Sequence, residues 1–68
     1  MIDKLQEILK GYGLGISKEE LVLQIYRTLK AEGIKDIAIL NNKYLTIEGQ
    51  DYKIIKSKKT NSWIVKQF

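Results

Sequence analysis

The pattern of apolar and polar residues divides the chain into a helical half and a strand half. From Ser17 to Gly33, apolar residues recur at helical spacing, which predicts one long amphipathic helix. Ser17 followed by Glu20 fits a capping box, and Gly33 suits a left-handed cap at the other end. The apolar stripe of this helix consists of Leu21, Val22, Ile25, Tyr26 and Leu29. We expect this stripe to be covered by the strands that follow.

A shorter helix is predicted over Ile2 to Lys10, because Ile2, Leu5, Ile8 and Leu9 lie on one side of it. A helix of this length is marginal in water by itself. We therefore expect it to pack against the long helix or against the edge of the sheet.

Three glycines, Gly11, Gly13 and Gly15, separate the two predicted helices. A phosphate-binding glycine loop follows a strand and leads into a helix, whereas a helix precedes this one. We interpret the segment as a helix cap followed by a tight interhelical loop. An anion site at the helix start, Ser17, is the alternative.

After Gly33 the spacing changes from helical to alternating, which predicts four strands joined by three turns. A three-residue loop from Leu40 to Asn42, with Asn42 left-handed, closes the first hairpin. Gly49 and Gln50 suit a type II′ turn that pairs Glu48 with Asp51. These turns place Ile37, Ile39, Leu45, Ile47, Tyr52 and Ile54 on one face.

The last turn is expected within Lys58 to Asn61. A four-residue loop there sends Trp63 and Val65 inward and leaves Ile64, Lys66 and Phe68 outward. Trp63 is expected to anchor the core, with exposure as a stacking surface the alternative.

The predicted fold is a single small α+β domain over residues 1–68. One short and one long N-terminal helix pack on one face of a four-stranded antiparallel meander, in the order ααββββ. The test of these registers is burial of the strand residues Ile37, Ile39, Leu45, Ile47 and Ile54 against the helix residues Leu21, Ile25 and Leu29.

The composition excludes several kinds of chemistry but does not by itself indicate a function. The 68 residues include no Cys and no His, which excludes disulfides, the usual zinc sites, the thiol nucleophile and the common proton shuttle. The one close carboxylate pair, Glu48 with Asp51, lies at an open hairpin tip. We therefore expect no enzyme activity, no metal and no cofactor.

The net charge of +4 is unevenly distributed. Residues 1–34 carry five cations and five anions, whereas residues 35–68 carry seven lysines and three acidic residues. Such an excess suits phosphate backbones or acidic proteins, although a general need for solubility would also account for it. Neither a signal peptide nor a long apolar run is present, so we expect a soluble, cytoplasmic protein without membrane partners.

The second face of the predicted sheet mixes lysines with apolar residues. Its candidate binding residues are Tyr44, Lys53, Ile55, Lys58, Lys59, Ile64 and Lys66. Cations beside aromatic rings favour single-stranded nucleic acid or RNA, and a lone Arg27 favours little sequence preference. The alternative is a protein-binding module, a homodimer or a small regulator, that uses the same face or the C-terminal edge strand. Scattered surface apolar residues without a function would give the same pattern.

Overall fold

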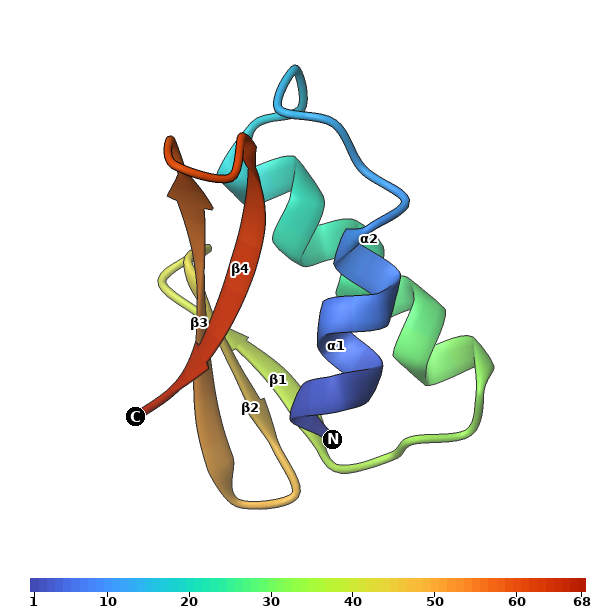
Figure 1. The fold of residues 1–68 in the computed structure, drawn as a ribbon. Coiled ribbons are helices and arrows are strands. Elements are labelled where there is room, and N and C mark those ends of the chain that lie inside the picture. The colour runs from blue at the N-terminus through green and yellow to red at the C-terminus, as the bar shows by residue number, and fades with distance from the viewer.

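Two helices lie on one face of a four-stranded antiparallel sheet (Figure 1) in a computed structural model that describes residues 1–68. The helices are α1 (Ile2–Leu9) and α2 (Lys18–Ala31). The strands are β1 (Ile37–Leu40), β2 (Tyr44–Ile47), β3 (Gln50–Ser57) and β4 (Ser62–Gln67), and they lie side by side in chain order. The predicted class and element order are therefore confirmed.

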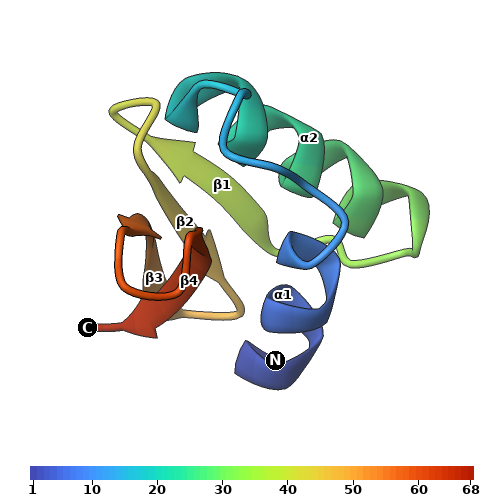
Figure 2. The same ribbon diagram turned by 45° about the horizontal axis from the view of Figure 1, so that its top comes forward.

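The helices divide the inner face of the sheet between them. α1 packs against β4, whereas α2 lies mainly over β1 and also reaches β2 and β3 (Figure 2). One core forms between the layers, and all 13 of its buried residues are apolar. It contains Leu5 and Leu9 from α1 together with the α2 stripe residues Leu21, Val22, Ile25 and Leu29. The amphipathic pattern of the sequence thus specifies which side of each helix is buried.

The start of α2 is capped by the side chain that the sequence indicates. The Ser17 Oγ accepts a hydrogen bond from the Glu20 N–H at 3.2 Å. The Glu20 carboxylate accepts a bond from the Gln24 side chain at 2.9 Å. Only the serine half of the predicted capping box is therefore formed.

The end of α2 is a Schellman cap. Gly33 has a φ of 97°, a left-handed conformation that glycine adopts without steric cost. Its N–H bonds to the Lys30 carbonyl at 3.0 Å, and the Ile34 N–H bonds to the Leu29 carbonyl at 3.1 Å. These bonds satisfy carbonyls at the helix end and direct the chain into β1.

The first hairpin differs from prediction by one residue on each strand. Asn41 and Asn42 are both left-handed, with φ of 54° and 59°, and the Lys43 N–H bonds to the Leu40 carbonyl at 3.0 Å. The loop is therefore Asn41 to Lys43, and Leu40 pairs with Tyr44. Asparagine tolerates the left-handed region, so two in succession place both central turn residues there.

The second turn is also shifted, and the predicted type II′ turn is wrong. Glu48 and Gly49 are the left-handed residues, with φ of 50° and 81°, so Ile47 pairs with Gln50. The Glu48 N–H bonds to the Asp36 carbonyl at 2.8 Å, which extends the β1–β2 pairing up to the turn. This bond fixes where β2 ends, and the sequence pattern did not reveal it.

Neither shift moves a side chain to the wrong face. A turn displaced by one residue on both strands changes each partner by two positions, and side chains alternate with a period of two. Leu45, Ile47 and Ile54 are almost fully buried, and Ile37 retains 8% exposure. Ile39 is only partly buried, so the expectation of complete burial is wrong for that residue.

Trp63 joins the sheet to the loop between the helices. Its indole is 2% exposed, and its Nε1–H donates to the Gly13 carbonyl at 2.9 Å. The Lys56 ammonium lies 5.2 Å from the ring centroid and reaches the Leu14 carbonyl at 3.4 Å. The predicted four-residue turn, Lys58 to Asn61, is confirmed, and so is the predicted position of Trp63 in the core.

Candidate binding face

The face of the sheet turned away from both helices, here called the outer face, carries most of the candidate residues. The registers place Leu40, Tyr44, Lys53 and Lys66 in one row across all four strands. Ile55 and Ile64 form the next row on β3 and β4. The alternation of the strands thus brings five of the seven candidate residues together.

Two aromatic rings meet on the outer face across β3. Tyr44 and Phe68 have ring centroids 5.4 Å apart and planes inclined by 63°, an edge-to-face contact. Phe68 is held by its N–H, which bonds to the Asp51 carbonyl at 3.1 Å, and its side chain is 57% exposed. We call Tyr44 and Phe68 the ring pair. A fixed and exposed aromatic ring can stack with a planar ligand.

Lys53 and Lys66 stand directly opposite each other on β3 and β4. Like charges in this position destabilise a sheet unless an anion lies nearby. The two ion pairs of the structure, Lys4 with Glu32 and Lys10 with Glu7, both belong to the helical half. No lysine of the strand half has a carboxylate partner. The lysines of the outer face therefore have no ion-pair partner, and the Asp51 carboxylate on the same face bonds to Thr46.

The Lys53 ammonium makes one contact with the ring pair. It lies 5.7 Å from the centroid of the Phe68 ring, a cation–π distance. Lys53 is exposed, and such a contact at an exposed site is weak, on the order of 0.5–1 kcal/mol. The Lys53 ammonium can therefore leave the ring and bind an external phosphate at little cost in free energy.

Lys58 and Lys59 lie apart from the row formed by Lys53 and Lys66. Both are exposed in the turn after β3, five or more residues from Lys53, which is about 16 Å along an extended strand. They extend the positive surface to one end of the sheet. They lie too far from the ring pair to contact the same nucleotide as Tyr44 and Phe68.

The predicted carboxylate pair does not form. Asp51 lies opposite Thr46 and accepts a hydrogen bond from its hydroxyl at 2.8 Å, whereas Glu48 occupies the turn. The cause is the shifted second turn, which separates the two residues in the register. The surface has no pocket, and no group of three or more acidic side chains gathers where a metal ion could bind.

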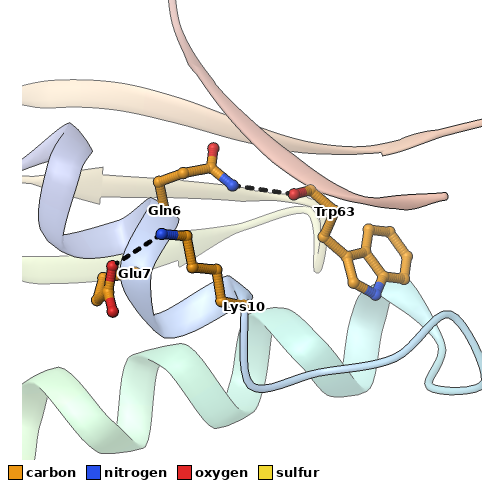
Figure 3. A network of polar contacts seen from close by, with 4 residues as sticks. All are labelled: Gln6, Glu7, Lys10 and Trp63. Atoms are coloured by element: carbon orange, nitrogen blue, oxygen red, sulfur yellow. Dashed lines mark hydrogen bonds and ion pairs between the residues drawn. The ribbon is translucent and has the colours of Figure 1, made fainter. Parts of the chain in front are cut away.

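A side chain of α1 occupies part of the free edge of β4, the edge that does not pair with β3. The Gln6 side chain donates from Nε2 to the Trp63 carbonyl at 3.1 Å (Figure 3). Its Oε1 accepts the Val65 N–H at 3.2 Å. One amide group thus satisfies a donor and an acceptor of an edge strand. A partner strand cannot pair with β4 at these residues unless it displaces Gln6.

No family model, curated protein or solved structure matches this chain. Neither helix has the length and apolar character needed to cross a membrane.

Phe68 and Leu40 belong to the outer face and were not among the candidate residues. Leu40 is 44% exposed on β1. The predicted alternation sends Phe68 outward together with Ile64 and Lys66, and this orientation is confirmed. The contact of Phe68 with Tyr44 was not predicted, because Tyr44 lies on β2, Phe68 directly follows β4, and these two strands do not pair with each other.

Proposed function

We propose that this chain is a non-enzymatic module that binds single-stranded nucleic acid on its outer face, with little sequence preference. The observation that carries the proposal is that Lys53 and Lys66 face each other on adjacent strands. Neither forms an ion pair with a carboxylate, and both lie close to the exposed ring of Phe68. Packing alone does not favour two facing lysines, whereas a phosphate between them removes their repulsion.

The chemistry of the face also favours a single strand over a duplex. A base that is free to unstack can lie on the Phe68 ring while its phosphates contact Lys53 and Lys66. The strand half has no arginine for bidentate contacts with guanine, and the face has no pocket to enclose a base. Phosphate contacts would then supply most of the affinity, so binding should depend strongly on salt.

The test is fluorescence anisotropy of a labelled single-stranded oligonucleotide, with a duplex of the same length for comparison. Each phosphate contact to a single strand gives a slope of about 0.7 in log affinity against log salt. Four contacts, from Lys53, Lys58, Lys59 and Lys66, predict a roughly fifty-fold loss of affinity between about 50 and 200 mM salt. Absence of binding at the lower salt concentration would overturn the proposal.

Variants of matched charge locate the surface. Lys53→Gln with Lys66→Gln should reduce the salt effect to roughly sevenfold, because two contacts remain. Lys10→Gln with Lys30→Gln removes the same charge from the helical half of the chain and should leave the slope unchanged. Equal effects of the two double variants would show a response to net charge alone. That result would contradict a site on the outer face.

The ring pair is tested separately from the lysines. Phe68→Leu keeps an apolar side chain but removes the stacking surface, so we expect about a tenfold loss of affinity. The salt slope should not change, because no charge is altered. Unchanged affinity would remove stacking from the proposal and leave binding by phosphate contacts alone.

Protein binding is the second candidate function. Ile55 and Ile64 lie opposite each other and half-buried on the outer face, which gives a small apolar patch beside the lysines. The alternative route, through the edge of β4, is weakened by the Gln6 bonds to Trp63 and Val65. A homodimer through the patch should be disrupted by Ile64→Lys, and the mass in solution reports this directly.

A further inference from the structure

The two edge strands of the sheet differ in whether side chains from elsewhere in the chain bond to their main chain. The β4 edge is bonded by Gln6 and carries Lys66, whereas no side chain bonds to the main chain of β1. The Asp36 carbonyl bonds to Glu48, and bonding alternates along an antiparallel pair. The N–H and C=O groups of Ile37 and Ile39 therefore point away from β2, toward the free edge.

The residues of β1 do not protect this edge. The strand reads Ile-Ala-Ile-Leu and contains no charged residue, proline or glycine. Proteins usually protect an edge strand with charged residues or proline, make it very short, or cover it with another element, because bare edges pair with other chains. Ala38 is exposed and Leu40 is 44% exposed, so both outer-face side chains of β1 are accessible.

We propose that the β1 edge pairs antiparallel with the β1 edge of a second copy of this chain, around a twofold axis at Ile39. In this register the Ile39 residues exchange main-chain hydrogen bonds. Leu40 of each copy then lies opposite Ala38 of the other copy on the outer face. A twofold axis perpendicular to the sheet keeps both helix layers on one side and both outer faces on the other.

The sequence of β1 favours a second copy over an unrelated strand, because it is complementary to itself in this register. The large exposed Leu40 meets the small Ala38 at both symmetric positions, where opposite side chains are closest. The partner edge must also be free, and β1 itself is a free edge without a charged residue. A symmetric contact needs no second protein to supply such an edge.

The flank of α2 above this edge adds apolar surface. Glu32 forms its ion pair with Lys4 of α1, and Tyr26 lies on the other flank of α2 by helical spacing. This flank faces the β1 side of the sheet, because α1 packs on the β4 side. Tyr26 is partly buried against the core, so part of its ring remains accessible beside the edge.

The size of the contact predicts a weak dimer. A stable interface buries about 1,200 Å² or more, and a four-residue edge with one flanking tyrosine is smaller than that. We therefore expect dimerisation in the range of roughly 10 µM to 1 mM, typical of a small, transient interface. The dimer would join two meanders into one continuous eight-stranded sheet.

Sedimentation equilibrium over that concentration range tests the proposal. The mass should rise from that of one chain toward twice that value. Leu40→Lys places a charge on the paired edge and should hold the mass at one chain. Ile64→Lys makes the same kind of change on the outer face of β4 and should leave dimerisation intact. Circular dichroism of each variant checks that it is folded.

The opposite results overturn the proposal. A wild-type mass of one chain throughout the range means that β1 does not self-associate. Dimers that persist in folded Leu40→Lys but disappear in Ile64→Lys place the interface on the outer face. Both results are independent of nucleic-acid binding, which is measured by anisotropy.

Cysteine cross-linking tests the register, because the chain has no cysteine of its own. Ala38→Cys and Leu40→Cys are mixed in equal amounts and oxidised. Opposite residues of a non-hydrogen-bonded pair have Cα atoms about 4.5 Å apart, which suits a disulfide. Mixed disulfides should exceed the roughly one-half share expected from random collision, and mass spectrometry distinguishes them from the two homodimers.

A mixture of Ala31→Cys with Leu40→Cys is the matched control. Ala31 is an exposed alanine at the end of α2, and it should form only the random share of mixed disulfides. The proposed register is wrong if the Ala38 and Leu40 mixture also gives only that share. A predominance of Ala38 homodimers would likewise exclude it.

Discussion

Six residues of this chain have a left-handed backbone, and each lies at a turn or a helix end. Two are glycines, Gly33 and Gly49, and three are the asparagines Asn41, Asn42 and Asn61. Glu48, with a φ of 50°, is the exception. A residue other than Gly, Asn or Asp loses roughly 1–2 kcal/mol in this conformation. Of the two turns that differ from the prediction, the second is thus the one with an unfavourable left-handed residue.

Glu48→Asn should stabilise the protein by about 0.5–1 kcal/mol, because Asn-Gly is a preferred pair in a type I′ turn. Urea unfolding measures the change. Glu48→Gln is the matched control, since it removes the charge but keeps a side chain that disfavours the left-handed region. An equal gain in both variants would assign the effect to charge rather than to backbone conformation.

At the scale of elements, a short helix and an edge strand stabilise each other. α1 has only eight residues, a length at which an isolated helix does not persist in water. Leu5 and Leu9 bury its apolar side, and Gln6 bonds to the main chain of β4. Sequence spacing predicted the apolar side of α1. It did not indicate that Gln6 bonds to β4, because glutamine is common in helices and nothing in its spacing shows that an edge strand lies beside it.

Gln6→Ala should lower the free energy of unfolding by about 1–2 kcal/mol, because it leaves the Trp63 carbonyl and the Val65 N–H without partners. Hydrogen exchange of the Val65 amide should accelerate in the same variant. Gln24→Ala is the control, since the Gln24 side chain bonds only to Glu20 within its own helix. If the two variants are equally stable, Gln6 does not hold α1 to the sheet.

At the scale of the whole molecule, one core connects all six elements. The buried residues of both helices and all four strands form a single cluster. Trp63 links this core to the interhelical loop through Gly13. A chain of this size buries only about 60% of its unfolded surface. Neither the helical pair nor the sheet therefore has enough core of its own to remain folded without the other.

Unfolding should therefore be a single cooperative transition. Trp63 fluorescence reports the sheet and the interhelical loop, whereas far-ultraviolet circular dichroism reports mainly the helices. The two urea midpoints should coincide, with a slope of roughly 1 kcal/mol per molar urea. Separate midpoints would show that the helical pair and the meander unfold independently, and would contradict the single domain expected from the sequence.

The spacing of apolar residues along the chain was enough to predict the elements, their order and the face that each residue occupies. Leu21 and Ile25 face the core because of helical spacing, and Leu45 and Ile54 do so because of strand alternation. This information is local and periodic, so a turn shifted by one residue on each side, as at Asn41 and Gly49, leaves the faces unchanged.

Contacts between residues that do not pair in the sheet depend on how the layers assemble. The contact of Tyr44 with Phe68 and the bonds of Gln6 to β4 join residues far apart in the chain, and such contacts depend on register and layer packing rather than on spacing. Of the candidate site, the facing lysines followed from the registers. The ring pair, the closed edge at β4 and the open edge at β1 required the assembled sheet.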